Sequence, residues 1–270
     1  ALQRLADPRV RERAVIIAAQ TTLRPLLDRG IRPHFVTALD YHRISARFYE
    51  GLTAADVAGV ELVVDPKAHP SILESFPGVV RCIGSPLLDA ILGDEARPMG
   101  SLTPGATVAH LSAYLARHLG CDPIITVGQD LGFTDCLYYG PDAVIHETWG
   151  PELGPFNPIT SMEWQRIARH RRHLQRLPAW NGGTVLSDAQ MVTYLQQFER
   201  DFAQDLERGL RVIDATGPGG ARKTGAEPMA FDEAVDRFAV TPLAPMPPAA
   251  RLVPDADQRR LATRRRVDQV

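Results

Sequence analysis

The chain alternates short apolar runs, rich in β-branched residues, with segments whose apolar residues recur at helical spacing. The strands that these runs predict occupy residues 14–19, 34–39, 61–65, 79–83 and 123–127. Runs that are apolar on both faces are typical of strands buried in a parallel sheet, and the helical segments between them supply the crossovers. The alternation therefore predicts an α/β fold with a mostly parallel sheet flanked by helices.

Polar residues stand at the ends of several predicted strands. Residues 20–22 (Gln-Thr-Thr) follow the first strand, 40–42 (Asp-Tyr-His) the second and 128–130 (Gly-Gln-Asp) the fifth. Open α/β sheets bind ligands beyond the carboxyl ends of their strands, which favours a functional role for these residues. The alternative role is structural: a threonine caps the helix predicted over 23–29, and Gly-Gln-Asp forms a tight turn followed by a helix cap. Asp40 has both possible roles, because it can cap the helix predicted over 44–52 or hold a ribose hydroxyl or a metal.

The residues from 104 to 149 are the most informative part of the sequence. They predict a loop, a helix, a strand and a polar loop, in that order. Apolar residues at helical spacing between 111 and 119 indicate the helix, and Gly120 stands where a glycine commonly ends one. The polar loop that follows the strand begins with Gly-Gln-Asp and ends at Trp149.

After Trp149 the sequence changes in character. It predicts a strongly basic helix over 162–177, on which we interpret His170 and His173 as a solvated or phosphate-facing surface rather than a metal site. A long amphipathic helix is predicted over 188–208, with its aromatic residues in the core. A further strand is expected over 209–216.

A glycine-rich loop at 217–220 follows the last predicted strand. It is weak support for phosphate binding, because it has neither the lysine pattern of a Walker A loop nor G-x-G-x-x-G spacing. Residues 242–254 are rich in proline and alanine and predict a linker, and the basic C-terminal end predicts a solvated tail. We therefore divide the chain into a core over 1–150, a helical part with a returning strand over 151–235, and a linker with a tail over 236–270.

Composition excludes several classes of protein. The 270 residues carry a formal net charge of -2, no apolar run approaches the length of a membrane span, and no secretory signal opens the chain. The three cysteines have no C-x-x-C spacing, which argues against a disulfide framework or a zinc site and favours a reducing cytoplasm. The basic residues form no recognisable reading motif, so we expect neither nucleic acid nor a membrane as a partner.

Three stretches resemble the MptE-like family, formerly a domain of unknown function, which includes the motility-associated factors (Maf) that modify flagellin. The stretches are VIIAAQTTLRPLLDRGIRPHFVTALD, GATVAHLSAYLARHLGCDPIITVGQDLGFTD and YLQQFERDFAQDLERGLRVIDATGPGGA. The resemblance spans roughly residues 10–230, and the run around GQDL is its most specific part. It implies a Rossmann-like core that binds a nucleotide-sugar, similar in fold to bacterial sialyltransferases that use CMP-activated nonulosonic acids.

The resemblance also implies the residues that bind the donor. Gln20 and Asp40 would hold the nucleotide, the turn at 105–107 would contact the donor, and Asp130 would hold the ribose or the base. The implied donor-binding residues are Gln20, Thr21, Asp40, Gly105, Ala106, Thr107, Gly128, Gln129, Asp130, Tyr138 and Tyr139.

Catalytic roles follow from the same resemblance. Tyr138, with its neighbour Tyr139 as a second choice, would donate to the leaving phosphate, where negative charge develops. His146 would be the base that deprotonates the acceptor hydroxyl. Together with Asp130 these residues make up the expected catalytic set.

The expected function is transfer of a nonulosonic acid from a CMP donor to a protein serine or threonine, flagellin being the expected acceptor, with no cofactor required. A second hypothesis is pyrophosphoryl transfer from ATP to 6-hydroxymethyl-dihydropterin, with Mg²⁺ held by carboxylates such as Asp40 and Asp130. A third is a nucleotide-binding or interaction module without catalysis. The family's first strand and its G-P-S-L turn have no counterpart here, so we expect that the natural protein continues upstream or that a principal part of the donor site is missing.

Overall fold

The computed structural model describes residues 2–97, 99–140, 146, 149–245 and 256–268. Its larger sheet has four parallel strands in the order β1-β2-β3-β4. The strands are β1 (Ile17–Ala19), β2 (Phe35–Ala38), β3 (Glu61–Val64) and β4 (Val79–Cys82). The segments between them are η1 (Gln20–Thr22), α3 (Leu23–Leu27), η2 (Arg43–Phe48) and α4 (Pro70–Ser75). Each lies where the sequence predicts a crossover, so the predicted α/β fold is confirmed.

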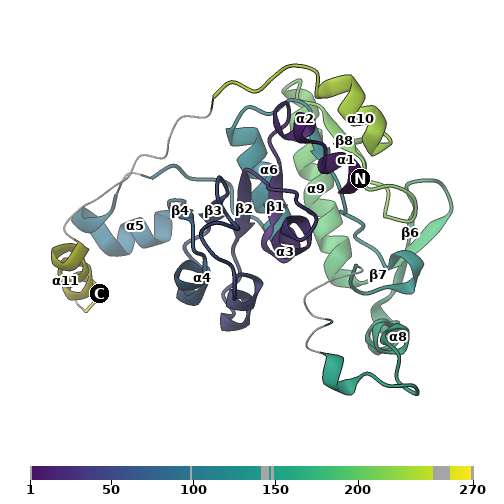
Figure 1. The fold of residues 1–270 in the computed structure, drawn as a ribbon, viewed down its shortest axis with the longest axis horizontal. Coiled ribbons are helices and arrows are strands. Elements are labelled where there is room, and N and C mark those ends of the chain that lie inside the picture. Colours follow the sequence, from purple (N-terminus) through teal and green to yellow (C-terminus); the bar gives the residue numbers. More distant parts are fainter. Residues whose placement is uncertain (1, 98, 141–145, 147–148, 246–255, 269–270) are drawn as a thin grey trace.

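A second parallel sheet follows, in the order β5-β8-β9. Its strands are β5 (Ile124–Thr126), β8 (Val212–Asp214) and β9 (Glu227–Pro228). Helix α6 (Val108–His118) joins the two sheets (Figure 1). Its first residue, Val108, lies against Thr37 near the end of β2, whereas Leu115 near its last turn packs with Phe35 at the start of that strand. Helix α6 thus runs opposite to β2, and β5 turns back from it, so the carboxyl ends of β2 and β5 face the same way.

Helices cover both faces of the larger sheet because its side chains alternate. Phe35 and Val63 pack with Leu115 of α6 on one face. Val36, Leu62 and Val64 face the opposite cluster, which also holds Tyr49 and Ile72. Alternation of this kind in strands buried on both faces fixes the register, since a slip of one residue would exchange the two packed surfaces.

The long amphipathic helix predicted over 188–208 is confirmed as α9 (Ala189–Glu207), whose N-cap Asp188 accepts a hydrogen bond from the amide of Met191. Phe198 and Phe202 of α9 pack on Ala113 of α6 and Val212 of β8. The remaining helices are α1 (Leu2–Leu5), α2 (Pro8–Arg11), α5 (Pro86–Leu92), η3 (Gly93–Glu95), η4 (Thr134–Cys136), η5 (Gly150–Glu152), α10 (Phe231–Phe238) and α11 (Ala256–Val267).

The helix predicted over 162–177 is wrong in its second half. Helix α8 (Ile159–Arg169) ends early, a short turn η6 (Arg171–His173) follows, and β6 (Gln175–Pro178) then pairs antiparallel with β7 (Thr184–Ser187). The hairpin turn contains Gly182 and Gly183, whose φ angles of 87° and 78° lie in the left-handed region that such turns require. The Gly182-Gly183 pair is the sequence signal for the hairpin, whereas the basic residues before it are equally compatible with a helix.

Two smaller predictions also need correction. Residues 43–48 form a 3₁₀ helix in place of the helix predicted over 44–52. Thr22 precedes α3 but its hydroxyl donates to the carbonyl of Ala19 instead of capping the helix, and Thr21 is exposed. The basic tail, predicted to be solvated, is mostly exposed; it forms helix α11, which packs against α5, and Arg266 donates to the carbonyl of Ile91.

The described residues also bear on the predictions about membrane spans, cysteines and the linker. Within the described ranges no helix is both long enough and apolar enough to cross a bilayer. Cys82, Cys121 and Cys136 are all free thiols. Of the predicted linker, residues 246–254 lie outside the described part, and Leu243 hydrogen-bonds the carbonyl of Glu12 at 2.8 Å.

Candidate functional site

The carboxyl end of β2 carries Asp40, whose carboxylate is occupied by its own loop. It accepts hydrogen bonds from the amide and ring of His42, each at 2.9 Å, and from the hydroxyl of Ser45. Burial acts to raise the pKa of Asp40, but these hydrogen bonds outweigh it and the pKa is lowered. Asp40 is therefore a negatively charged group whose partners all lie within five residues of it in the chain.

Beside it, the N-terminus of α6 is built from the predicted turn at 105–107. Gly105 is buried, and a Cβ there would lie 3.1 Å from the backbone amide of Leu111, so only glycine fits without a shift. Thr107 is the N-cap, and its hydroxyl lies 2.8 Å from Nδ1 of His110. Gln20, at the end of β1, is 2% exposed, and its Oε1 has no hydrogen-bond partner among the described residues.

The ends of β5 and β8 bring together Asp130, Asp214 and Lys223. Nζ of Lys223 donates to Oδ2 of Asp214 at 3.0 Å and to the carbonyl of Ala221 at 3.1 Å, in a setting where both charged side chains are almost fully buried. Burial lowers the pKa of Lys223 against the opposing effect of Asp214. Burial likewise raises the pKa of Asp130, which Lys223 opposes. The pKa values of Lys223 and Asp130 are thus shifted toward each other, as in sites that hold or transfer protons.

The loop from Gly128 to Cys136 is strained, and hydrogen bonds hold it in place. Leu131, Asp135 and Cys136 have φ angles of 49°, 53° and 60°, a left-handed conformation that non-glycine residues rarely adopt. The carbonyl of Asp130 accepts from the amide of Ala221 at 2.7 Å, which ties this loop to the glycine-rich loop. Strain of this kind persists only where surrounding contacts hold it, and it is concentrated at functional sites.

A buried carboxylate, Glu163 of α8, gathers the three residues that the resemblance marked for catalysis. Its Oε2 accepts from the amides of Tyr138 and Tyr139 at 2.6 and 3.1 Å, and its Oε1 lies 2.7 Å from Nε2 of His146. The side chain of Glu163 is 1% exposed and that of His146 16%. The ring of Trp149 lies 5.2 Å from that of His146.

The structure separates the predicted residues into three groups. Tyr138, Tyr139 and His146 surround Glu163, whereas Asp130 lies with Lys223, and Asp40 lies with its own loop. Gln129 is partly buried beside Asp130, and Gly128 and Ala106 are exposed. Among the described residues, no group of three or more His, Cys, Asp or Glu side chains is arranged to hold a metal ion.

Sequence reasoning missed Glu163, Asp214 and Lys223. Asp214 lies inside the strand predicted over 209–216, whereas the observed strand β8 ends at it, so the rule of strand ends would have found it only with the correct strand boundary. Lys223 is one of two lysines in the chain. Glu163 had no such signal, because two of its donors are backbone amides 24 and 25 residues earlier.

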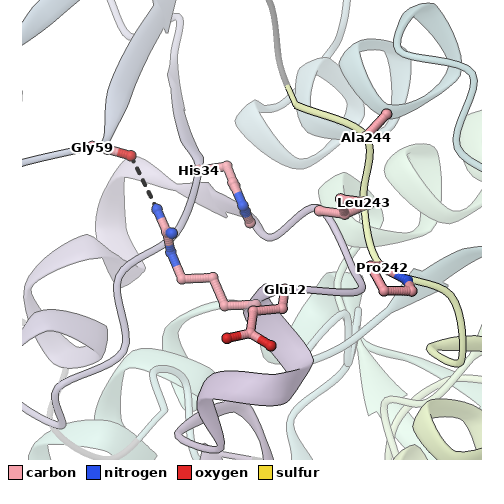
Figure 2. Close-up of a pocket in the computed structure, with 7 residues that line it drawn as sticks. Glu12, His34, Gly59, Pro242, Leu243 and Ala244 are labelled. Carbon is pink, nitrogen blue, oxygen red and sulfur yellow. Dashed lines mark hydrogen bonds between the residues drawn. The ribbon is translucent and has the colours of Figure 1, made fainter.

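A cavity of about 500 Å³ lies elsewhere, at the amino end of β2. Figure 2 shows His34 and Glu12 beside it, with Arg11 donating to the carbonyl of Gly59. Residues 242–244 form its other wall. Burial lowers the pKa of His34 to about 4, so its ring is neutral near pH 7. None of the predicted site residues lines this cavity, because they lie at the opposite, carboxyl ends of the strands.

Comparison with protein-family models gives a match over the first half of the chain. Residues 4–136 match the family described as "6-hydroxymethylpterin diphosphokinase MptE-like". The family resemblance that the sequence motifs indicated is confirmed over this segment. A search of curated proteins finds no match.

Comparison with solved structures gives a match over almost the whole chain. The fold is similar to that of a MAf glycosyltransferase from Magnetospirillum magneticum AMB-1, with a TM-score of 0.57 and 18% sequence identity. The similarity covers 98% of this chain and 35% of that chain, so the present chain spans about a third of the length of the solved protein. At this level of identity the match shows the shared fold.

Proposed function

We propose that this protein is a glycosyltransferase acting on a nucleotide-activated sugar. The premise is the MptE-like segment at residues 4–136. The donor is a CMP-activated nonulosonic acid and the acceptor is a serine or threonine of a flagellin-like protein. The fold shared with a MAf glycosyltransferase supports this choice, because it extends past residue 136 to cover 98% of the chain, including α8 and the Lys223 loop.

The contact that carries the proposal is the pair of His146 and Glu163. When Glu163 is ionised, Nε2 of His146 donates to it across 2.7 Å, which leaves Nδ1 with a lone pair that can accept a proton. A buried carboxylate that orients an imidazole in this way is a common arrangement for a general base. His146 would take the proton of the acceptor hydroxyl while the oxygen of that hydroxyl attacks the anomeric carbon of the sugar.

Tyr138 supplies the second half of the reaction. Burial raises the pKa of Tyr138, so its phenol stays protonated near neutral pH and can donate a hydrogen bond. As the bond from the anomeric carbon to the phosphate oxygen breaks, CMP leaves with the electron pair and gains negative charge on that oxygen. Tyr138 would stabilise this charge, with Tyr139, held by the same Glu163, as the alternative donor.

We assign donor binding to the strand ends and to the N-terminus of α6. Gln20, Thr21 and Asp40 would bind the nucleotide, and the turn from Gly105 through Ala106 to Thr107 would present backbone amides to the donor. Gly128, Gln129 and Asp130 would contact the ribose or the base. The unpartnered Oε1 of Gln20 supports this assignment, because a buried acceptor without a partner is destabilising unless a ligand satisfies it.

The second candidate is pyrophosphoryl transfer from ATP to 6-hydroxymethyl-dihydropterin. One observation favours it, namely the description of the family that residues 4–136 match. It requires Mg²⁺ held by carboxylates, for which Asp40 and Asp130 are the candidates, to neutralise the polyphosphate. The two reactions differ in donor, in metal requirement and in acceptor, so one set of assays separates them.

The test is a transfer assay with CMP-sialic acid and a serine-rich acceptor peptide, run beside an assay with ATP, Mg²⁺ and the pterin. We expect CMP release in the first assay, reduced about 10²- to 10⁴-fold in His146→Gln. The control is His118→Gln, which changes an exposed histidine at the end of α6. Turnover only with ATP would replace the proposal by the diphosphokinase, and binding of neither nucleotide would leave a non-catalytic module.

A further inference from the structure

The segment from Trp164 to Ser187 is strongly basic in a chain that is not. It contains five arginines and no aspartate or glutamate, whereas the chain as a whole has a net charge of -2. The nearest acidic residues in sequence are Glu163 and Asp188, and both are buried and occupied by hydrogen bonds. The positive charge of this segment is therefore not balanced by its neighbours along the chain.

Four of the five arginines are exposed and lie within eight consecutive residues, and we call them the arginine surface: Arg169, Arg171, Arg172 and Arg176. In the described part of the structure none of the four forms an ion pair with a carboxylate, and their single side-chain hydrogen bond joins Arg171 to the carbonyl of Ala168 at 3.5 Å. The fifth, Arg166, differs because its guanidinium lies 4.3 Å from the ring of Trp149. Four guanidinium groups thus remain able to meet an anionic partner.

The arginine surface borders the candidate catalytic residues. It begins at the end of α8, the helix that carries Glu163, and continues through η6 into β6. His170, between Arg169 and Arg171, has its ring 6.3 Å from that of Tyr138. A partner bound on the arginine surface would reach the site that holds Tyr138 and His146 without crossing the rest of the molecule.

We propose that the arginine surface docks an acidic protein segment, so that acceptors with aspartate or glutamate near the modified hydroxyl are preferred. This inference rests on the proposed function, since it concerns the acceptor of that same site. Guanidinium groups pair with carboxylates through two parallel hydrogen bonds, and several such contacts together orient an extended segment. A protein partner fits better than a nucleic acid, because the chain has a pI near 6.5, far from the strongly basic values of most nucleic-acid-binding domains.

The chain offers a matched control in its second arginine-rich segment. Arg264 and Arg265 of α11 are also exposed, and α11 lies beside α5 at the opposite end of the molecule from α8 (Figure 1). The double variants Arg169→Gln/Arg172→Gln and Arg264→Gln/Arg265→Gln change the net charge equally. They differ only in where the charge is lost.

The experiment measures binding of two fluorescent peptides by anisotropy, one with a serine flanked by aspartate and glutamate and one with asparagine and glutamine in their place. We expect the acidic peptide to bind more tightly, with an affinity that falls as salt is added. Arg169→Gln/Arg172→Gln should weaken its binding about 5-fold, and Arg264→Gln/Arg265→Gln should leave it unchanged.

Three results would overturn the inference: equal affinity for the two peptides, an equal loss in the two double variants, or tighter binding of an oligothymidine or of phosphatidylserine vesicles than of the acidic peptide. Failure of the proposed transferase function can be distinguished from failure of the docking surface, because peptide binding is measured without the sugar donor. Transfer that ignores peptide charge would overturn the docking surface alone, and binding without any transfer would overturn the transferase alone.

Discussion

The two sheets end in carboxylates that are held in opposite ways. Asp40, beyond β2, is partly exposed and takes its hydrogen bonds from His42 and Ser45. Asp214, at the end of β8, is buried and paired with Lys223, with Asp130 close enough to interact with that lysine. The pKa of Asp40 is lowered, whereas that of Asp130 is raised by burial.

The difference separates a local turn from a site assembled over long range. The carboxylate of Asp40 would keep its partners in almost any fold that retains its loop, because His42 and Ser45 lie within five residues of it. Asp130 comes near Lys223 only when β5 and β8 pair, because the lysine is 93 residues later in the chain (223 minus 130). Groups whose charge depends on the whole fold are the better candidates for chemistry.

The largest effect should come from breaking the buried pair. Asp214→Ala leaves the ammonium of Lys223 buried without its carboxylate, which we expect to lower the free energy of unfolding by about 3–5 kcal/mol. Asp40→Ala removes hydrogen bonds at a partly exposed position and should cost about 1 kcal/mol. Urea denaturation measures both values. Equal losses would show that burial does not distinguish the two carboxylates, and recovery in Asp214→Leu/Lys223→Met would confirm that the unpaired charge is the cause.

A smaller effect should come from the glycine-rich loop that closes over Asp130. Gly217 and Gly219 have the same φ of 94°, but a Cβ on Gly219 would lie 2.5 Å from Cγ2 of Thr134, whereas a Cβ on Gly217 meets nothing within 4 Å. Gly219→Ala should therefore be more destabilising than Gly217→Ala by about 1–3 kcal/mol.

Thermal unfolding of the two alanine variants measures that difference, and the background Thr134→Ser supplies the control. Serine lacks Cγ2 but keeps the hydroxyl that reaches Asp130 at 3.4 Å. The penalty of Gly219→Ala should shrink in this background while that of Gly217→Ala stays the same. A penalty that is unchanged by Thr134→Ser would place the strain in the backbone alone.

The smallest effect should appear in the pH dependence of stability, where the two carboxylates have opposite signs. The folded-state pKa of Asp40 lies below the ordinary 3.8, so its contribution is present above that value and is lost as pH falls through the folded pKa. The folded-state pKa of Asp130 lies above 3.8, so its contribution grows as pH falls through the folded pKa.

Comparing Asp40→Asn and Asp130→Asn with the parent chain isolates each contribution. On acidification the parent should lose its advantage over Asp40→Asn and gain relative to Asp130→Asn. Carboxyl titration followed by NMR gives the two pKa values directly. Trends of the same sign would remove the electrostatic difference between the two strand ends.

The parts of the fold that the sequence predicted are those fixed by local pattern. The run at 34–39 is apolar at every position but His34 and Thr37, and α9 repeats its aromatic residues at helical spacing. Each element can therefore be predicted without knowledge of the rest of the chain. Strand β6 was missed because its polar residues, Gln175 and Arg176, suit a helix as well as an exposed strand. The segment forms a strand because it pairs with β7.

For the candidate site, the sequence predicts positions only for residues at strand ends. Residues at strand ends, such as Asp40 and Asp130, could be placed because topology brings parallel strand ends to one edge. The role of Glu163 could not, because it is defined by the amides of Tyr138 and Tyr139 and the ring of His146, and no spacing rule relates a helix residue to such a distant loop.

The anchoring of the loop that begins at Asp130 also bears on how such proteins can be recombined. Its amide at Phe133 bonds the carbonyl of Leu186, its carbonyl at Asp130 bonds the amide of Ala221, and Tyr138 bonds Glu163. Any chimera with a crossover point between 140 and 162 would combine a loop from one parent with all three anchors from another. Functional shuffling within this fold should therefore exchange the loop together with α8, the β6–β7 hairpin and the glycine-rich turn, as one inherited block.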